Sequence, residues 1–314
     1  MAKITWFCMI SFSCQCIFAQ HDTLTLRSYA VSYEEKMTAS FTYQHSSNTF
    51  FMAYEDAAAT YKAQFIPNTK QRLVAGLSYK FIDVSIGFTP NFMKTDASKL
   101  ASNNFNLGLR FNYKKWYQSL TFINQKGFFV DYNEYERFYL PRLRSTKIGG
   151  TASYVFNEKF SYKTLFNQNQ WQRKSAGSFV PNIAIYYTNI TSKEQAATFH
   201  VDIYTFSVAP SYHYNWVISQ NFLVSAGLLI GAGINIVDKE AAALYEVAAN
   251  IKLGYNNDSF FTYLGINSTS FFQQEKATQF YDSFADVKLS LGYRFNPPKK
   301  FKKFYDTTMK KVGF

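Results

Sequence analysis

The sequence predicts an all-β protein, a transmembrane antiparallel up-and-down β-barrel, from three observations. About twelve stretches alternate apolar and polar residues with a period of two, most clearly at 105–113, 245–255 and 287–295, and this period places successive side chains on opposite faces of a strand. The stretches run for about ten residues or more, the length that a tilted strand needs to cross a bilayer. Aromatic residues make up 19% of the chain, as expected where aromatic bands lie at both lipid interfaces.

The alternation predicts strands at 70–80, 82–90, 102–113, 115–124, 145–156, 159–169, 179–190, 200–214, 219–235, 241–256, 259–271 and 281–296. Tight connections between them are typical of the periplasmic side of a barrel, and longer ones of the outer side. An earlier rising strand within 36–56 is needed if both termini are periplasmic. The alternation of short and long connections fails once, between 159 and 200, so we predict about twelve strands, with fourteen as the alternative.

Residues 1–19 have the pattern of a secretory signal peptide. Lys3 supplies the positive charge, the following residues are mostly apolar, and Ala19 is the small residue at the cleavage position. We therefore expect export to the outer membrane of a Gram-negative cell. All three cysteines lie in this segment, so the mature chain has no disulfide and no thiolate ligand or nucleophile. No later stretch holds 18 consecutive apolar residues, so no helical span is expected.

Residues 20–296 are predicted to form one barrel, followed by a basic periplasmic tail at 297–314. The formal charge of the chain is +12, which can indicate nucleic-acid binding, but an exported barrel does not meet nucleic acid. We interpret the tail as a solvated end, with attraction to acidic lipid or glycan as the alternative. The expected partners are outer-membrane lipid, lipopolysaccharide and the barrel-assembly machinery, and we expect a monomer. The tail holds Lys299, Lys300, Lys302, Lys303, Lys310 and Lys311 against Asp306.

The search for catalytic chemistry yields one weak candidate. The four histidines, His21, His45, His200 and His213, show no zinc-type spacing, so we predict no metal and no cofactor. His213 shares a strand face with Ser207 and Ser211, but residues two apart on a strand are about 7 Å apart, beyond hydrogen-bond reach. A serine on a neighbouring strand, such as Ser225, is the alternative nucleophile. We expect His213 to be a lumen or rim histidine bonded to its neighbours.

The polar face of the strands is mainly basic and is predicted to line the lumen. A positive, water-filled lumen favours anions, so these side chains are candidate binding residues for a small anionic solute. The alternative is that they cross-link and fill the interior. The candidates are Arg72, Lys80, Arg110, Lys147, Lys163, Lys252, Lys288 and Arg294, against Asp83, Glu246 and Asp286.

The segment 125–144 is read as a long connection rich in aromatic residues. Three placements fit it: folded into the lumen, exposed as a recognition surface, or packed on the barrel rim.

Several short motifs resemble an uncharacterised outer-membrane barrel family, the domain of unknown function 4421. The most specific is the Lys-Ser-Ala-Gly-Ser-Phe run at 174–179, and further matches lie at 66–68, 78–80, 126–128, 154–157, 160–162 and 292–295. The resemblance implies location and fold and brings no activity with it. The small residues at 175–178 permit close backbone approach, so we expect a strand bend, a bulge or an inward fold there.

These observations favour a non-enzymatic barrel that acts as a small channel, a receptor surface or a structural or secretion accessory. The alternatives are an acyl hydrolase or acyltransferase acting on lipid or lipopolysaccharide, with His213 as base, and a soluble β-sandwich or lipocalin-like binder. The barrel requires Leu107, Ile251 and Leu289 to face lipid. It also requires the strand-borne basic side chains to face the interior.

Overall fold

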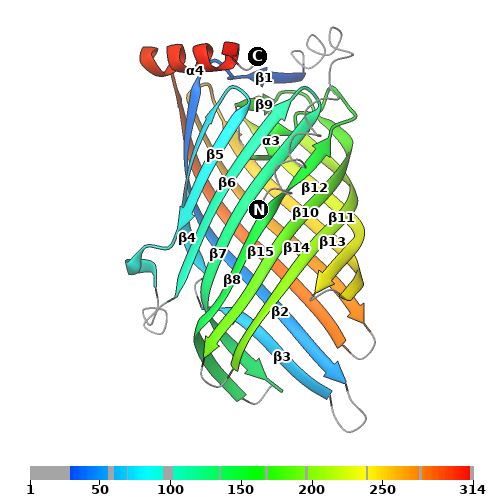
Figure 1. Cartoon of the computed structure of the whole chain (residues 1–314). Helices are drawn as coiled ribbons and strands as arrows, with labels where there is room; N and C mark the ends of the chain where they lie inside the picture. Colours follow the sequence, from blue (N-terminus) through cyan, green and yellow to red (C-terminus); the bar gives the residue numbers. More distant parts are fainter. Residues whose placement is uncertain are drawn as a thin grey trace.

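The computed structural model describes residues 29–55, 60–68, 70–94, 102–133, 136–166, 169–194, 197–237, 240–275 and 278–311. Thirteen strands of this part form one antiparallel sheet, which closes where β15 (Thr278–Phe295) pairs with β2 (Met37–Glu55) (Figure 1). β3 (Thr60–Pro67) and β4 (Gln71–Tyr79) pair with different parts of β2, so together they make one crossing. The wall is therefore a closed barrel of twelve crossings, which confirms the predicted fold class.

The other wall strands follow one another in chain order around the barrel. They are β5 (Ile82–Phe88), β6 (Asn103–Tyr113), β7 (Trp116–Tyr132), β8 (Glu136–Tyr154), β10 (Ala176–Glu194), β11 (Ala197–Val217), β12 (Phe222–Val237), β13 (Glu240–Asn256) and β14 (Phe260–Glu275). The β5–β6 hairpin is short and its connection carries the single-turn helix η1 (Asn91–Met93). Beyond the hairpin, β3 pairs directly with β7.

The two faces of the wall are those that the alternation predicts. Leu107, Ile251 and Leu289 are exposed on the outside, while Lys252 and Arg294 are buried on the inside. An outward apolar face and an inward polar face are the arrangement of a membrane-spanning barrel. The sandwich alternative is wrong, because the sheet closes on itself. No helix of the described residues is long and apolar enough to cross a membrane.

Two segments differ from the predictions. The sequence predicts a strand at 159–169, but the described residues of this stretch form a turn and the short helix α3 (Lys163–Phe166). Residues 125–144 were predicted as a long connection, but β7 and β8 run through this region as a hairpin. A bulge at Gly127, whose φ is +86°, shifts the alternation by one residue and turns Phe128 toward the interior. The alternation of apolar and polar residues is interrupted at this bulge, so the sequence does not reveal that the strand continues beyond it.

One segment leaves the wall between β8 and β10 and folds into the barrel. It carries α3 and β9 (Gln170–Gln172), and β9 pairs with β1 (Ala30–Ser32) (Figure 1). Thr164, Trp171 and Gln172 within it are almost completely buried. We call residues 155–175 the plug. The plug directly precedes and overlaps the start of the Lys-Ser-Ala-Gly-Ser-Phe run, where an inward fold is among the expectations.

The C-terminal segment forms the helix α4 (Lys299–Lys311), which lies at the same end of the barrel as β1 and β9 (Figure 1). The sequence was interpreted as a solvated tail, but Tyr305 is buried against Met37 and Tyr79. We call this the α4 end and the opposite one, where β7–β8 and β10–β11 turn, the hairpin end. The predicted signal peptide at 1–19 lies outside the described residues.

Candidate functional site

Two cavities lie in the part of the lumen that the described residues line. The plug-side cavity has a volume of about 400 Å³, and the plug residues Tyr162, Leu165 and Phe166 form part of its lining. The hairpin-side cavity has a volume of about 290 Å³ and is lined by wall residues nearer the hairpin end, such as Phe50 and Phe128. Thr151 lines both. The lumen is thus neither packed solid nor a wide pore.

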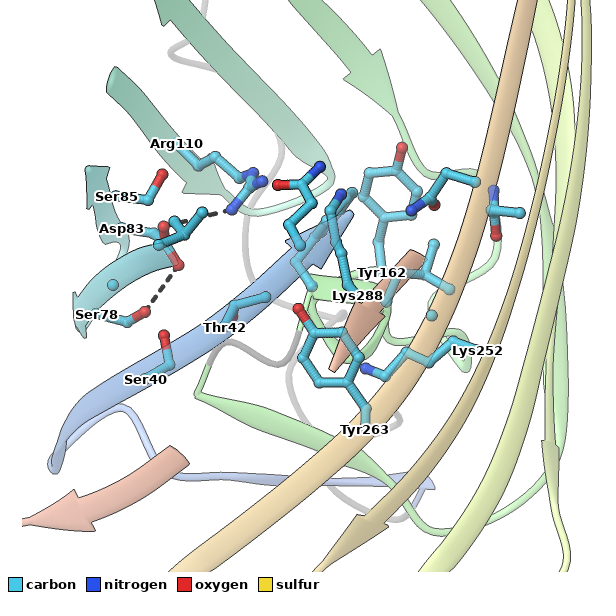
Figure 2. A pocket seen from close by; sticks show the side chains of 18 of the residues that line it. Ser40, Thr42, Ser78, Asp83, Ser85, Arg110, Tyr162, Lys252, Tyr263 and Lys288 are labelled. Carbon is cyan, nitrogen blue, oxygen red and sulfur yellow. Dashed lines mark hydrogen bonds and ion pairs between the residues drawn. The ribbon is translucent and has the colours of Figure 1, made fainter. Parts of the chain in front are cut away.

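Among the charged side chains that line the plug-side cavity, the basic ones outnumber the acidic ones, and Arg110, Lys252 and Lys288 are seen in Figure 2. Arg110 on β6 lies with its Nη1 atom 3.4 Å from Oδ1 of Asp83 on β5, and Ser78 donates a hydrogen bond to the other oxygen of Asp83 at 2.8 Å. Their backbones fix this arrangement, because Asp83 pairs with Ser78 on one side and with Arg110 on the other.

A second acid–base group lies across the cavity. The Lys288 Nζ atom is 3.1 Å from Oδ1 of Asp286, which also accepts a hydrogen bond from the Asn267 amide at 2.9 Å. Arg72 donates through Nε to the Gln44 side chain at 2.9 Å. Because Gln44, Lys288 and Gly265 pair across β2, β15 and β14, these groups share one belt of the wall.

Arg110 and Lys288 reach the cavity water, whereas the carboxylates beside them are withdrawn into the wall. The side chains of Arg110 and Lys288 are 38% and 30% exposed, and those of Asp83 and Asp286 are 10% and 1% exposed. Counting Arg72, Arg110, Lys252 and Lys288 against Asp83 and Asp286, four positive and two negative groups leave a formal charge of +2. A solute in this cavity would meet guanidinium and ammonium groups first.

Two other predicted lumen cations, Lys252 and Arg294, make contacts at the α4 end of the barrel. Lys252 is buried, donates to the Thr164 carbonyl of the plug and lies 4.7 Å from the centre of the Tyr263 ring. Arg294 lies over the Tyr33 ring at 3.9 Å and donates to the Asn257 carbonyl at 3.0 Å.

Hydrogen bonds join the plug to the wall at several points. The Asn215 amide donates to the Ser161 carbonyl and to the Gln172 side chain, each at 3.1 Å. The Trp171 indole donates to the Gln220 carbonyl at 3.1 Å. Lys163 in α3 forms an ion pair with Glu34. Burial lowers the pKa of the Lys163 amine, and the neighbouring Glu34 carboxylate opposes this shift.

The hairpin-side cavity has a different character. The lining residues with a formal charge are Lys147, Glu246 and Asp282, one base against two acids. At its hairpin end Phe50, Phe128, Leu143 and Ile190 form a buried cluster, with Phe65, Leu140, Val201 and Ile203 packed on it. Phe50 stacks on Phe65 with ring centres 4.4 Å apart. We call this cluster the apolar constriction.

The structure places the eight predicted basic residues in three settings. Lys80 was predicted in the lumen, but it occupies the β4–β5 turn with φ +53° and pairs with Glu35 at 3.4 Å. Lys163 lies inside the barrel but on the plug, because its segment is not a strand. The remaining six, Arg72, Arg110, Lys147, Lys252, Lys288 and Arg294, face the lumen from wall strands.

Sequence reasoning missed the partners of these residues. Glu34 and Asp282 were not considered, although Glu34 forms the ion pair with Lys163 of the plug and Asp282 lines the hairpin-side cavity. Asp282 lies in the alternating stretch of β15 with Asp286, so its strand face was available as a signal. No sequence signal pairs Glu34 with Lys163, which is 129 residues away.

The candidate catalytic histidine is part of the buried wall. His213 Nε2 lies 3.0 Å from the Ser211 hydroxyl, so the expectation that two residues on one strand cannot reach each other is wrong. The side chains lean together, while Ser211 also donates to the Val180 carbonyl at 2.6 Å. His213 Nδ1 has no hydrogen-bond partner among the described residues. Ser225 bonds to Asn215 instead, and no cluster of three metal-ligating side chains occurs in the described residues.

The comparisons with known proteins concern family and architecture. A family model described as Domain of unknown function (DUF4421) matches residues 20–295. The comparison with curated proteins gives no match. Among solved structures, the chain is similar to the translocator domain of the autotransporter NalP from Neisseria meningitidis, with 9% identity, 83% of this chain and 88% of that chain covered, and a TM-score of 0.43.

Two further solved structures are similar at the same level. One is the COG4313 outer membrane channel from Pseudomonas putida F1, with 12% identity, 89% and 100% coverage and a TM-score of 0.40. The other is the outer membrane protease OmpT from Escherichia coli, with 9% identity, 84% and 98% coverage and a TM-score of 0.32. At these identities the likeness is one of architecture.

Proposed function

The chain belongs to the DUF4421 family, and we propose that it is a gated channel of the outer membrane that admits a small anionic solute to its plug-side cavity. The proposal includes export through the signal peptide at 1–19 and insertion with the α4 end in the periplasm. The role is non-enzymatic, and the Ser211–His213 pair is a structural part of the wall.

The arrangement of charge in the plug-side cavity carries the proposal. Arg110 and Lys288 reach the cavity, while their partners Asp83 and Asp286 are withdrawn. Cations that line a water-filled passage attract anions and repel cations. The volume of about 400 Å³ lies in the range of small-molecule sites.

The plug supplies the gate. It is held to the wall by hydrogen bonds from Asn215, Trp171 and Lys252 and by the packing of Phe160, Tyr162 and Trp171, rather than by a continuous strand pairing. Such bonds can be exchanged for bonds to water at a modest net cost of about 1 kcal/mol each. Displacement of the plug therefore opens the α4 end without breaking the barrel.

The test is conductance in planar bilayers of the protein and of a variant in which residues 160–172 are replaced by a short Gly-Ser turn. We expect little conductance from the natural chain. The variant should conduct steadily, with a reversal potential in a KCl gradient that shows anion preference. Adding R110Q and K288Q should abolish this preference, because both exposed cations are then neutral.

The matched control is K62Q/K70Q, which neutralises two exposed lysines at the hairpin side of the wall and should leave the anion preference intact. Heat-modifiable mobility confirms that each variant is folded. A folded plug-replaced variant that stays silent, or that prefers cations, would contradict the proposal.

A further inference from the structure

α4 packs on the outer face of the barrel wall and does not enter the lumen. The side chains that receive it, Met37, Tyr79, Ile82 and Phe295, belong to the outward faces of β2, β4, β5 and β15. Two residues earlier on β4 and β15, Leu77 and Tyr293 are exposed on that same outward face. The helix therefore covers wall surface that is otherwise continuous with the lipid-facing belt.

Aromatic residues mark the height of the membrane boundary at this end. Tyr113 ends β6, Phe222 begins β12, and Trp216 and Tyr293 lie near the ends of β11 and β15; all four are exposed on the outside. Such girdles lie at the level of the lipid headgroups. α4 starts four residues after β15 ends, and its Tyr305 ring contacts the Tyr79 ring at 5.0 Å. The helix is thus held beside the headgroup layer.

The surface of α4 has an apolar face and a basic face, as expected of a helix beside the headgroup layer. Phe301, Tyr305 and Met309 repeat every four residues, as residues on one helix face do, and they pack on the wall. Phe304, on the flank of this face, is 68% exposed. Away from the wall the helix carries lysines, all of them exposed, and a groove between them is lined by Lys299, Lys302, Lys303, Asp306, Thr307 and Lys310.

The charge of the helix is strongly one-sided. Six lysines against Asp306 give +5 over thirteen residues. No carboxylate of the described residues forms an ion pair with any of these lysines. A helix with an apolar edge and a basic face adsorbs in the plane of a bilayer, and each lysine near an anionic surface contributes to that attraction.

We propose that α4 is a lipid-binding helix that lies in the headgroup layer of the periplasmic leaflet and binds the phosphates of anionic phospholipids. Phe304 enters the acyl boundary, and the lysines extend toward headgroup phosphates, with their alkyl stems along the apolar surface. An acidic soluble protein would suit the lysines, but it would leave Phe304 beside the aromatic girdle without an apolar partner. The inference is independent of the function proposed for the lumen.

The experiment uses the barrel refolded in nanodiscs, so that both leaflets have the same composition. The chain from residue 20 onward has no cysteine, so single-cysteine variants F304C and D306C can carry an environment-sensitive NBD dye. The discs contain phosphatidylcholine alone or with 30% phosphatidylglycerol. We expect blue-shifted emission and strong quenching by brominated lipid at 304, larger in the anionic discs, and little of either at 306.

Charge removal tests the phosphate contacts. In K300Q/K302Q/K303Q carrying the dye at 304, the preference for brominated phosphatidylglycerol over brominated phosphatidylcholine should fall by roughly tenfold or more. Raising the salt from about 0.01 M to about 1 M should reduce the preference of the unmutated helix, because the Debye length shrinks from about 30 Å to about 3 Å. The control K62Q/K70Q/K193Q removes three exposed lysines distant from α4 and should keep the preference.

Two results would overturn the inference. The first is equal emission and equal quenching at 304 and 306 in both kinds of disc. The second is a response at 304 that appears only when a soluble acidic protein or glycan is added, which would assign the helix to a periplasmic partner. Heat-modifiable mobility of each variant excludes misfolding as the cause of a lost signal.

Discussion

The two ends of the lumen are built in different ways. At the α4 end a separate segment, the plug, enters the barrel and bonds to the wall through groups such as Asn215 and Trp171. At the hairpin end the wall strands themselves carry a buried cluster of apolar side chains, which includes Phe50, Phe128 and Leu143. Both ends also depend on apolar packing, since Trp171 packs against Leu223 and the plug residues Phe160 and Tyr162 pack with Val180 of the wall. The difference is that the plug is a separate segment, which moves in the channel proposed above, whereas the apolar constriction is part of the wall itself.

The largest effect is expected from Phe128→Ala, which tests the packing of the apolar constriction. The ring is almost fully buried in the apolar constriction, so its loss should lower the free energy of unfolding by about 3–5 kcal/mol. Guanidinium unfolding of the folded barrel measures the change. Phe129→Ala, next to it on the outward face and stacked with Arg137, should cost less than half as much. Equal losses would show that the constriction is not a packed unit.

The variant Trp171→Ala tests how much a buried side chain contributes to the docking of the plug. The indole is buried against Leu223 and bonded to the Gln220 carbonyl, and its removal should weaken the docked plug by roughly 3 kcal/mol. We expect faster hydrogen exchange across 160–172, with protection of β12 to β14 retained. Uniformly faster exchange in those strands would mean that plug and wall unfold together and that the plug is not an independent closure.

The ion pair between Glu34 and Lys163 makes the plug sensitive to pH. Burial lowers the pKa of Lys163, so the undocked plug holds this proton more tightly, and docking strengthens as pH rises toward the ordinary lysine pKa of about 10.4. Glu34→Gln leaves the ammonium without its counter-charge. It should weaken docking by about 1–2 kcal/mol at pH 7, since Glu34 is itself 41% exposed.

Hydrogen exchange of 160–172 at pH 7 and pH 10, corrected for the intrinsic exchange rate, measures this effect. The Glu34→Gln defect should shrink at pH 10, because a neutral amine needs no carboxylate. Glu35→Gln is the matched control: its bond to Lys80 is at the surface and should contribute about 0.5 kcal/mol or less. A Glu34→Gln defect that stays constant with pH would contradict the electrostatic account.

The smallest expected effect is that of Ser211→Ala in the wall beside the plug. The hydroxyl bonds to the Val180 carbonyl and to His213, so its loss should cost about 1–2 kcal/mol. Because the role proposed for the pair is structural, acyl release from lipid or lipopolysaccharide should be equal to background for both the natural chain and the variant. Release that depends on Ser211 would favour the enzyme alternative.

The strands that alternate without interruption could be predicted, and those that do not could not. β13 and β15 alternate apolar and polar residues clearly over 245–255 and 287–295, and a period of two is a local property. The plug segment also alternates in part, with Phe160, Tyr162 and Thr164 two residues apart, and was therefore read as a strand. Only the pairing of β8 with β10 excludes it from the wall.

The candidate site was predictable in its residues and unpredictable in their roles. Arg72, Arg110, Lys147, Lys252, Lys288 and Arg294 face the lumen as the alternation indicates. Lys252 and Arg294 bind groups at the α4 end of the barrel, because the register brings Lys252 beside Thr164 of the plug and Arg294 beside Tyr33. Lys80 fell in a turn, where a left-handed backbone interrupts the alternation.

The sequence by itself determined that the chain forms a wall with an apolar outside and a basic inside, because the side to which a strand residue points depends only on its neighbours in the chain. The tertiary structure decided which of those basic groups meet water, which hold the plug and where α4 rests. These outcomes depend on register and barrel closure, which join residues as distant as Glu34 and Lys163 or Met37 and Phe295. Contacts of that kind follow from how the whole sheet closes, and no local pattern encodes them.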